Sequence, residues 1–462
     1  MQATTLSIAI IASTIVVFVR PLYGLIVYSA AMVLYPQYLT FPVFTANFTI
    51  CRLVIIVLLA KVFLGTDISR HFKFILLDKL VILFFACVII AGAVTTRTLG
   101  DFLVNQAGAV FDMLLPYFAV RMIVRNRNHY LTLLKWILII AAPLAIVGLY
   151  QCFTGNNPVG FMRQYSTWLP GFDYQPLARK GLYRANVTFS VSILYGLFFA
   201  MFGPVCAGLL YIQTRRKAFY WIGLMLMGAG IFASMSSGPM MAGMLSVLFI
   251  IFYRWRRYYK SVLVMIIVMC LSVEIVSNRH FYDVLGSLTL DPRTAWYRSK
   301  LIDVAIFEGG MSGHWLVGFG NDVEPGWCAR IDGRQHTDIV NQYILVLSRY
   351  GLLGLIPFLA LNVEAVRRMI VAYKAGEMGR DKWLVWCLAA AILGLYGAFM
   401  TVSLFDQVPT IFFMLLGFAG VMPTLVITET EHAIGSARRS RYMIEPKETL
   451  LTHDIYSRLY TI

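Results

Sequence analysis

Lys79-Leu-Val-Ile-Leu-Phe-Phe-Ala-Cys-Val-Ile-Ile-Ala-Gly-Ala-Val-Thr-Thr96 is a stretch whose length and apolar character decide the fold. A membrane-spanning helix needs roughly 17–25 mostly apolar residues, and comparable stretches recur along nearly the whole chain of 462 residues. The chain is 59% hydrophobic and only 13% charged, which excludes a water-soluble fold of this size. Since a lipid-exposed backbone must satisfy its own hydrogen bonds, these stretches predict an all-α polytopic membrane protein.

About twelve to thirteen transmembrane helices are expected. Arg20-Pro21 splits one long apolar run into two short helices, because proline suits the first position of a helix and not its interior. The first stretch has neither a cationic leader nor a small-residue cleavage site, so we expect a retained span. The predicted spans are 4–19, 22–39, 49–65, 79–96, 102–124, 130–153, 187–212, 218–235, 239–253, 261–276, 339–363, 383–404 and 408–427.

The formal net charge of +16 follows the topology of the predicted spans. Arginine and lysine gather in connections on one side of the predicted topology, near 121–127, 215–217, 254–260 and 367–374. The connections on the other side are uncharged at 40–48 and 236–238. This positive-inside pattern places the basic connections in the cytoplasm and predicts attraction to anionic membrane lipids, with no nucleic-acid partner.

Four regions follow from this topology. Residues 1–276 form a transmembrane bundle of about ten spans with an outer loop at 154–186. A large periplasmic loop with short helices occupies 277–338. Further transmembrane helices cover 339–427, and 428–462 is a cytoplasmic tail.

The sequence offers little to hold a metal ion. It contains no CxxC pair and no Cys/His ligand spacing, and six of its seven cysteines lie in or beside apolar spans, where a thiol acts as a small hydrophobe. No Asp-x-Asp pair is present, so the usual carboxylate route to a divalent cation holding a diphosphate lacks its ligands. Any phosphorylated substrate would therefore be neutralised by guanidinium groups, which bind phosphate oxygens bidentately.

Several arginines lie where outer loops meet spans, and they are the candidates for this role. Arg184 precedes the span that begins near Val187. Asp291-Pro292 is typical of a helix start, and the spacing that follows predicts one helix face shared by Arg293, Trp296, Tyr297 and Lys300. The alternative for this helix is an aromatic anchor at the membrane interface. Further candidate cations on the outer side are Arg179, Arg298, Arg330 and Arg334.

His336 is the imidazole at the boundary where the chain re-enters the membrane. An imidazole titrates near neutrality and can take a proton from a hydroxyl nucleophile. The alternative is a half-exposed interfacial histidine without a catalytic role. Asp338, two residues on, would orient an imidazole or, in the simpler interpretation, cap the following helix.

Four short segments resemble motifs of the O-antigen ligase and Wzy-type polysaccharide polymerase superfamily. Residues 336–358 resemble its hallmark, a histidine at the loop end, then Asn-x-Tyr-Leu, then Gly-Leu-x-Gly-Leu within the span. Residues 291–296 and 316–320 are similar to its Arg-x-x-x-Trp and Gly-x-Gly elements, and 182–189 is similar to the arginine element before a central span. Two departures are Ser236-Ser237-Gly238-Pro239, which lacks the family's arginine, and Trp315-Leu316, which lacks a proline.

The resemblance implies a GT-C-like fold and a metal-independent, inverting glycosyltransferase without a cofactor. Such an enzyme transfers a glycan from an undecaprenyl-diphosphate donor to a hydroxyl acceptor at the periplasmic face of the bacterial inner membrane. It implies that Arg184 and Arg293 clamp the diphosphate and that His336 activates the acceptor. The expected substrate-binding residues are Arg179, Trp296, Arg298, Arg334 and Asn341, and the expected protein partners are a flippase and a chain-length regulator.

Alternatives in two directions stay open. A polymerase uses a lipid-linked repeat unit as acceptor, whereas a ligase uses lipid A-core; the stretch around Asn321 and Trp327 favours the exopolysaccharide polymerase branch. A glycan transporter would instead depend on acidic groups such as Glu274 and Asp406. A purely structural membrane partner is the remaining alternative.

Overall fold

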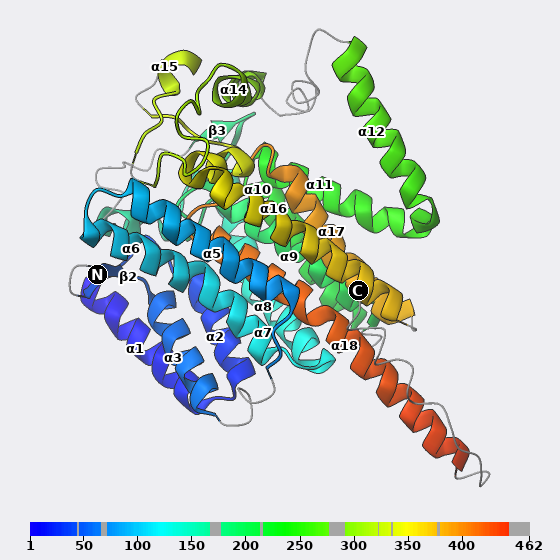
Figure 1. Ribbon diagram of the computed structural model, residues 1–462. Helices are drawn as coiled ribbons and strands as arrows, with labels where there is room; N and C mark the ends of the chain where they lie inside the picture. Colours follow the sequence, from blue (N-terminus) through cyan, green and yellow to red (C-terminus); the bar gives the residue numbers. More distant parts are fainter. Residues whose placement is uncertain are drawn as a thin grey trace.

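The computed structural model describes residues 1–43, 46–65, 72–166, 177–212, 216–276, 292–321, 323–333, 336–376 and 379–442. It is an all-α polytopic architecture in which each of the predicted spans contains a helix (Figure 1). Eight helices in the described part of the chain are long and apolar enough to cross a membrane. The total of twelve to thirteen spans stays a prediction, because several helices are shorter than that criterion.

The helices before the first large loop are α1 (Gln2–Phe18), α2 (Pro21–Leu34), α3 (Ile50–Leu64), α5 (Leu76–Thr95), α6 (Leu99–Ala109), α7 (Leu115–Ile123) and α8 (Arg127–Thr154). A π-helical turn, η1 (Val110–Leu114), joins α6 to α7. The predicted break is confirmed, because α1 ends at Phe18 and α2 begins at Pro21.

The second half of the bundle is built around two almost fully enclosed helices, α9 (Ser192–Ile212) and the first part of α18 (Val408–Tyr442). Helix α9 packs against α10, α11 and α17, and α16 packs against α5 and α18. The remaining bounds are α10 (Lys217–Ala233), α11 (Ser237–Phe252), α12 (Tyr259–Val276), α16 (Gln342–Ala375) and α17 (Gly379–Ala398).

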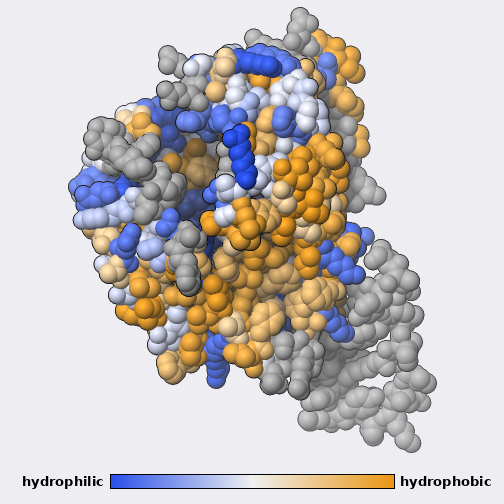
Figure 2. Space-filling view, turned by 60° about the vertical axis from the view of Figure 1, so that its left-hand side comes forward, coloured by the Kyte–Doolittle hydropathy of each residue, from blue (hydrophilic) through white to orange (hydrophobic). Residues whose placement is uncertain are grey.

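The two ends of the bundle differ in structure and in charge. One end, called here the loop end, carries the hairpin β3 (Ala178–Arg179) and β4 (Leu182–Tyr183) and the loop helices α14 (Pro292–Ile302) and α15 (Cys328–Ile331), seen in the upper part of Figure 1. The other end, the basic end, carries the arginine-rich connections. Figure 2 shows an apolar middle zone, with hydrophilic side chains gathered above it around a hollow.

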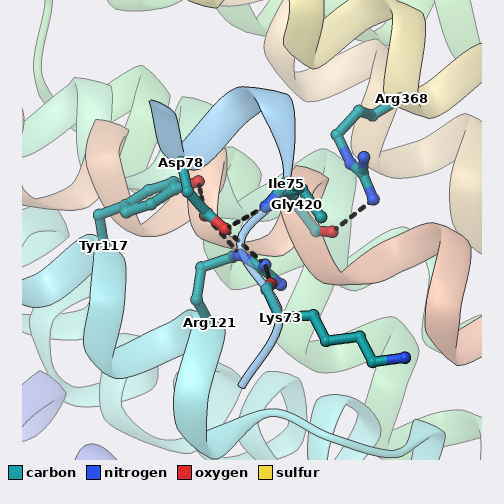
Figure 3. A network of polar contacts seen from close by, with 7 residues as sticks. All are labelled: Lys73, Ile75, Asp78, Tyr117, Arg121, Arg368 and Gly420. Carbon is teal, nitrogen blue, oxygen red and sulfur yellow. Dashed lines mark hydrogen bonds and ion pairs between the residues drawn. The ribbon is translucent and has the colours of Figure 1, made fainter. Parts of the chain in front are cut away.

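A buried polar network stabilises the basic end (Figure 3). Asp78 is fully buried at the start of α5 and accepts hydrogen bonds from the Tyr117 hydroxyl at 2.6 Å and from Arg121 Nε and Nη2, both at 2.8 Å. The same carboxylate accepts from the Ile75 backbone N–H at 2.9 Å, and Arg121 also donates to the Lys73 carbonyl. This network joins α5 to α7, and its buried charges are paired.

Candidate functional site

The hairpin β3–β4 places two of the predicted arginines on one face. Its two-residue turn, Lys180-Gly181, has positive φ at both positions, 52° and 80°, as a type I′ turn requires. Arg179 pairs with Leu182, and the Arg184 N–H donates to the Leu177 carbonyl at 2.9 Å. Because cross-strand partners share a face and side chains alternate along a strand, Arg179 and Arg184 project from the same face.

Helix α14 contributes the third arginine from its buried face. That face consists of Tyr297, Arg298, Leu301 and Ile302, whereas Trp296 is 55% exposed. The buried face is therefore shifted by about one residue from the face that the spacing predicts for Arg293, Trp296, Tyr297 and Lys300. The shift arises because Leu301 and Ile302 pack into an apolar cluster under the loop helices, which turns Arg298 inward to 8% exposure.

The connection between α10 and α11 is the place where these elements meet. The Ala185 N–H donates to the Ala233 carbonyl at 2.9 Å, Arg179 Nη1 lies 3.4 Å from the Met235 carbonyl, and Arg298 Nη2 lies 3.4 Å from Ser237 Oγ. Met235 has φ +44°, a strained value for this residue type. The connection between α10 and α11 has no arginine of its own, but Arg179 and Arg298 contact it from elsewhere in the chain.

Arg179, Arg184 and Arg298 form what we call the arginine cluster, and its electrostatics are unfavourable as it stands. Burial, together with the neighbouring Arg179 charge, lowers the pKa of both Arg184 and Arg298 to about 10, so both remain cationic at neutral pH. The nearby Asp338 charge acts in the opposite direction and raises the pKa of Arg298. Arg184 and Arg298 thus each lie beside the like charge of Arg179.

Several nitrogens of the arginine cluster have nothing to bind. Arg184 Nε and Arg298 Nε and Nη1 are buried without a hydrogen-bond partner in the part of the chain that the structure describes. Leaving a charged donor buried and unsatisfied costs more than leaving a neutral one, roughly 1–3 kcal/mol or above. Such an arrangement is typical of a site that receives an anion, whose oxygens would satisfy the free donors.

Trp296, His336 and Asn341 are predicted site residues that lie outside this cluster. Arg293 belongs to α14, but its side chain is outside the described residues, as is Arg334 altogether. Trp296 is on the exposed face of α14. The His336 side chain is 86% exposed, with Nδ1 3.8 Å from Glu324 Oε2, so its imidazole points into solvent.

The chain beside His336 nevertheless approaches the arginine cluster. The Asp338 N–H donates to the Tyr297 hydroxyl at 2.9 Å, which attaches the segment after His336 to α14. The Thr337 N–H donates to Glu324 Oε1 at 2.9 Å. His336 is thus two residues from a contact with the helix that carries Arg298.

Asn341 has a structural position. Its Oδ1 accepts from the Tyr343 and Ile344 N–H groups, capping α16, and its Nδ2 donates to the Met400 carbonyl at 3.2 Å. It is 3% exposed. Helix capping therefore accounts for Asn341, while Asp338, the cap suggested by the sequence, precedes the helix by several residues.

Two glycine motifs that are far apart in the sequence pack together. Helix α16 is broken at Gly351, where φ is +62°, and a Cβ there would lie 2.3 Å from the Leu316 carbonyl carbon. Into this break docks the Gly318-Phe319-Gly320 turn, with the Phe319 N–H donating to the Ser348 carbonyl and the Gly320 N–H to the Arg349 carbonyl. The glycines allow a loop backbone to lie directly against a helix backbone.

A polar cavity near Asp406 was not predicted from the sequence. Arg52 and Asp112 form a bidentate pair at 2.9 and 2.6 Å on its lining, although both belong to predicted spans. The signal was available, because an ionisable residue inside a span is a functional candidate by default. No group of three or more His, Cys, Asp or Glu that could hold a metal ion occurs among the described residues.

No family model matches the chain, and no curated protein matches it either. Function is therefore inferred from the arginine cluster, the exposed imidazole and the architecture that holds them.

Proposed function

We propose that this protein is a GT-C-type glycosyltransferase of the O-antigen ligase and polysaccharide polymerase superfamily, acting at the periplasmic face of the inner membrane. The observation that carries the proposal is the arginine cluster, with buried and unsatisfied guanidinium nitrogens at the end of the bundle opposite the basic connections. By the positive-inside pattern, that end faces away from the cytoplasm.

The ligand that best fits the arginine cluster is a diphosphate attached to a polyprenyl chain. Arg184 and Arg298 are cationic and each lies beside the charge of Arg179, which complements a diphosphate monoester or diester. The apolar exterior of the bundle suits the lipid part of such a donor. Arg293, on the first turn of α14, stays a proposed second clamp for the same group.

The reaction proposed is displacement at the anomeric carbon of the donor sugar. The acceptor hydroxyl oxygen forms the new bond to that carbon, the bond to the diphosphate oxygen breaks, and its electron pair leaves with the diphosphate. Attack from the opposite face inverts the configuration. The arginines stabilise the charge that develops on the leaving group, a contribution of roughly 2.7–4 kcal/mol per preorganised donor.

His336 is proposed to receive the proton of the acceptor hydroxyl. Its exposed imidazole is free to turn, and the segment that follows it is attached to α14 through Tyr297. A base must come within hydrogen-bond reach of the proton it removes, although such contacts often tighten only in the substrate complex. Extended sugar lying across the loop end would present its hydroxyl there.

The acceptor is proposed to be a second lipid-linked repeat unit, which makes the protein a polymerase. The test is to supply the purified protein in liposomes with lipid-linked repeat units alone and to separate the products by size. A ladder of polymers is expected, and Arg184→Ala and Arg293→Ala are each expected to abolish it without lowering protein yield. A single coupled product that appears only when lipid A-core is added would instead identify a ligase.

A further inference from the structure

A polar cavity of about 300 Å³ opens beside the hairpin β1 (Phe41–Val43) and β2 (Ala46–Phe48), and none of the three clustered arginines lines it. Its volume is at the lower end of the roughly 300–1,000 Å³ typical of small-molecule sites, enough for a sugar ring and too little for a polyprenyl tail. Polar residues that line it are Gln37, Asn47, Arg52, Asp112, Asp406 and Thr410.

One wall of this cavity reaches into a membrane-spanning segment. Asp112 lies on the π-helical turn η1, in the middle of the span formed by α6 and α7, yet its side chain is 33% exposed. Its carboxylate is held by Arg52 Nε and Nη2, and Arg52 Nη1 donates to the Asn47 carbonyl at 2.8 Å. The exposure of a paired charge at this depth indicates a cavity that admits polar ligand atoms.

A second wall carries Asp406, in the connection between α17 and α18. Asp406 has φ +56°, a left-handed conformation that few residue types adopt, and Ser190 Oγ donates to its Oδ2 at 2.8 Å. Burial raises the pKa of this carboxyl to about 6. At neutral pH it is therefore largely a carboxylate, able to accept hydrogen bonds from a ligand.

The lining matches a ligand whose groups both donate and accept hydrogen bonds. Asp406 accepts, the amide of Asn47 can do both, and Arg52 and Asp112 cancel each other's charge. A diphosphate would find no surplus positive charge here, and a hard cation would compete with Arg52 for both oxygens of Asp112. Sugar hydroxyls, which donate and accept from one atom, fit this mixture.

The cavity is connected to the arginine cluster by a short, well-fixed segment. Ser190, which contacts Asp406, follows Arg184 by six residues, so the two sites are at most about 20 Å apart. Between them, Asn186 and Thr188 are both buried, and the Thr188 hydroxyl donates to the Val33 carbonyl at 2.7 Å. An oligosaccharide bound by its diphosphate at one site can therefore extend to the other.

We propose that this cavity is a specificity subsite that binds a sugar residue of the lipid-linked repeat unit, remote from the bond that reacts, with Asp406 as its main hydrogen-bond acceptor. The proposal rests on the proposed function, since it takes the same lipid-linked glycan as ligand. It adds a determinant of which sugar is accepted, at a place where the arginines make no contact.

The test measures access to the cavity directly. Asn47→Cys places a thiol on its exposed rim, and a small water-soluble methanethiosulfonate reagent is applied to the full-length protein in liposomes. Peptide mass spectrometry reports modification at position 47 separately from the native cysteines. Lipid-linked repeat unit is expected to slow the modification at least fivefold, whereas undecaprenyl diphosphate without sugar leaves the rate unchanged.

The Asp406→Asn substitution in the same background is expected to remove the protection. An unchanged modification rate without ligand would show that its cavity is intact. Three results would overturn the subsite. They are equal protection by sugar-free undecaprenyl diphosphate, protection by sodium chloride that choline chloride does not give, and no protection at all. Polymer formation without protection would refute the subsite alone, while protection without any polymer or coupled product would refute the proposed function alone.

Discussion

Arginine is buried at both ends of this bundle, but in opposite circumstances. At the basic end, Arg121 has an 8% exposed side chain and meets a fully buried Asp78 through two 2.8 Å hydrogen bonds (Figure 3). At the loop end, Arg298 is buried and Arg184 half-buried beside another arginine, and some of their nitrogens have no partner among the described residues.

Arg121 thus has a structural role, whereas Arg184 and Arg298 are proposed to bind a ligand. A buried charge that is paired and fully hydrogen-bonded needs nothing further, and removing its partner leaves an uncompensated charge. Buried like charges with unsatisfied donors destabilise the empty protein and are stabilised only by an added anion. The comparison therefore predicts opposite responses when an arginine is removed from each end.

Arg121→Gln is expected to have the largest effect on stability. It leaves the Asp78 carboxylate buried without its cationic partner, and breaking a buried pair in this way costs about 3–5 kcal/mol of folding free energy. Reversible unfolding in mixed micelles measures the loss, while turnover per folded molecule stays unchanged. Arg368→Gln is the matched control, because Arg368 donates to the Gly420 carbonyl while its Nε has no partner among the described residues, so its removal should cost at most about 1 kcal/mol. Equal losses for the two variants would contradict this account of the network.

Arg298→Gln is expected to lower turnover by roughly 10²–10³-fold, the effect of removing one preorganised donor to a departing charge. Its thermal stability should equal or exceed that of the wild type, because a repulsive buried charge is gone. Turnover is measured with lipid-linked repeat units in liposomes, and melting is followed by intrinsic fluorescence. Lys180→Gln, at the exposed turn of the same hairpin, serves as control and should change neither quantity. If the Arg298 variant is destabilised but fully active, Arg298 has a structural role like that of Arg121.

Inorganic pyrophosphate alone is expected to raise the melting temperature of the wild type. An anion that binds only the folded state stabilises it by about 2.7 kcal/mol at a hundredfold excess over its Kd. The shift should persist in Lys180→Gln and vanish in Arg298→Gln. Sodium chloride at matched ionic strength separates binding from general screening. A shift that survives in Arg298→Gln would mean that the anion binds elsewhere.

Local sequence was sufficient for most of the secondary structure. The apolar stretches predicted their helices, and Arg20-Pro21 predicted the break between α1 and α2, because proline restricts the backbone wherever it stands. The buried side of α14 could not be predicted, since which side of a short helix is buried depends on the cluster it packs into. The docking of Gly318–Gly320 on Gly351 could not be foreseen from spacing alone.

The candidate site was predictable in composition and not in arrangement. Without paired acidic motifs, arginine was the expected partner for phosphate, and Arg179, Arg184 and Arg298 were all named in advance. Their meeting on one connection depends on a hairpin and a loop helix more than a hundred residues apart in the chain. Asn341 was read as a substrate ligand, yet its amide caps α16, a role that shows only once the helix start is located.

By itself, the sequence determined that this chain builds apolar helices with basic connections on one side, because hydrophobicity and charge are properties of local stretches. Only the tertiary structure decided which charges are neutralised. Asp78 and Arg121 are 43 residues apart and form a pair, while Arg184 and Arg298 are each brought beside Arg179, with nitrogens that have no hydrogen-bond partner among the described residues. Whether a buried charge is compensated depends on long-range packing, and no local pattern records it.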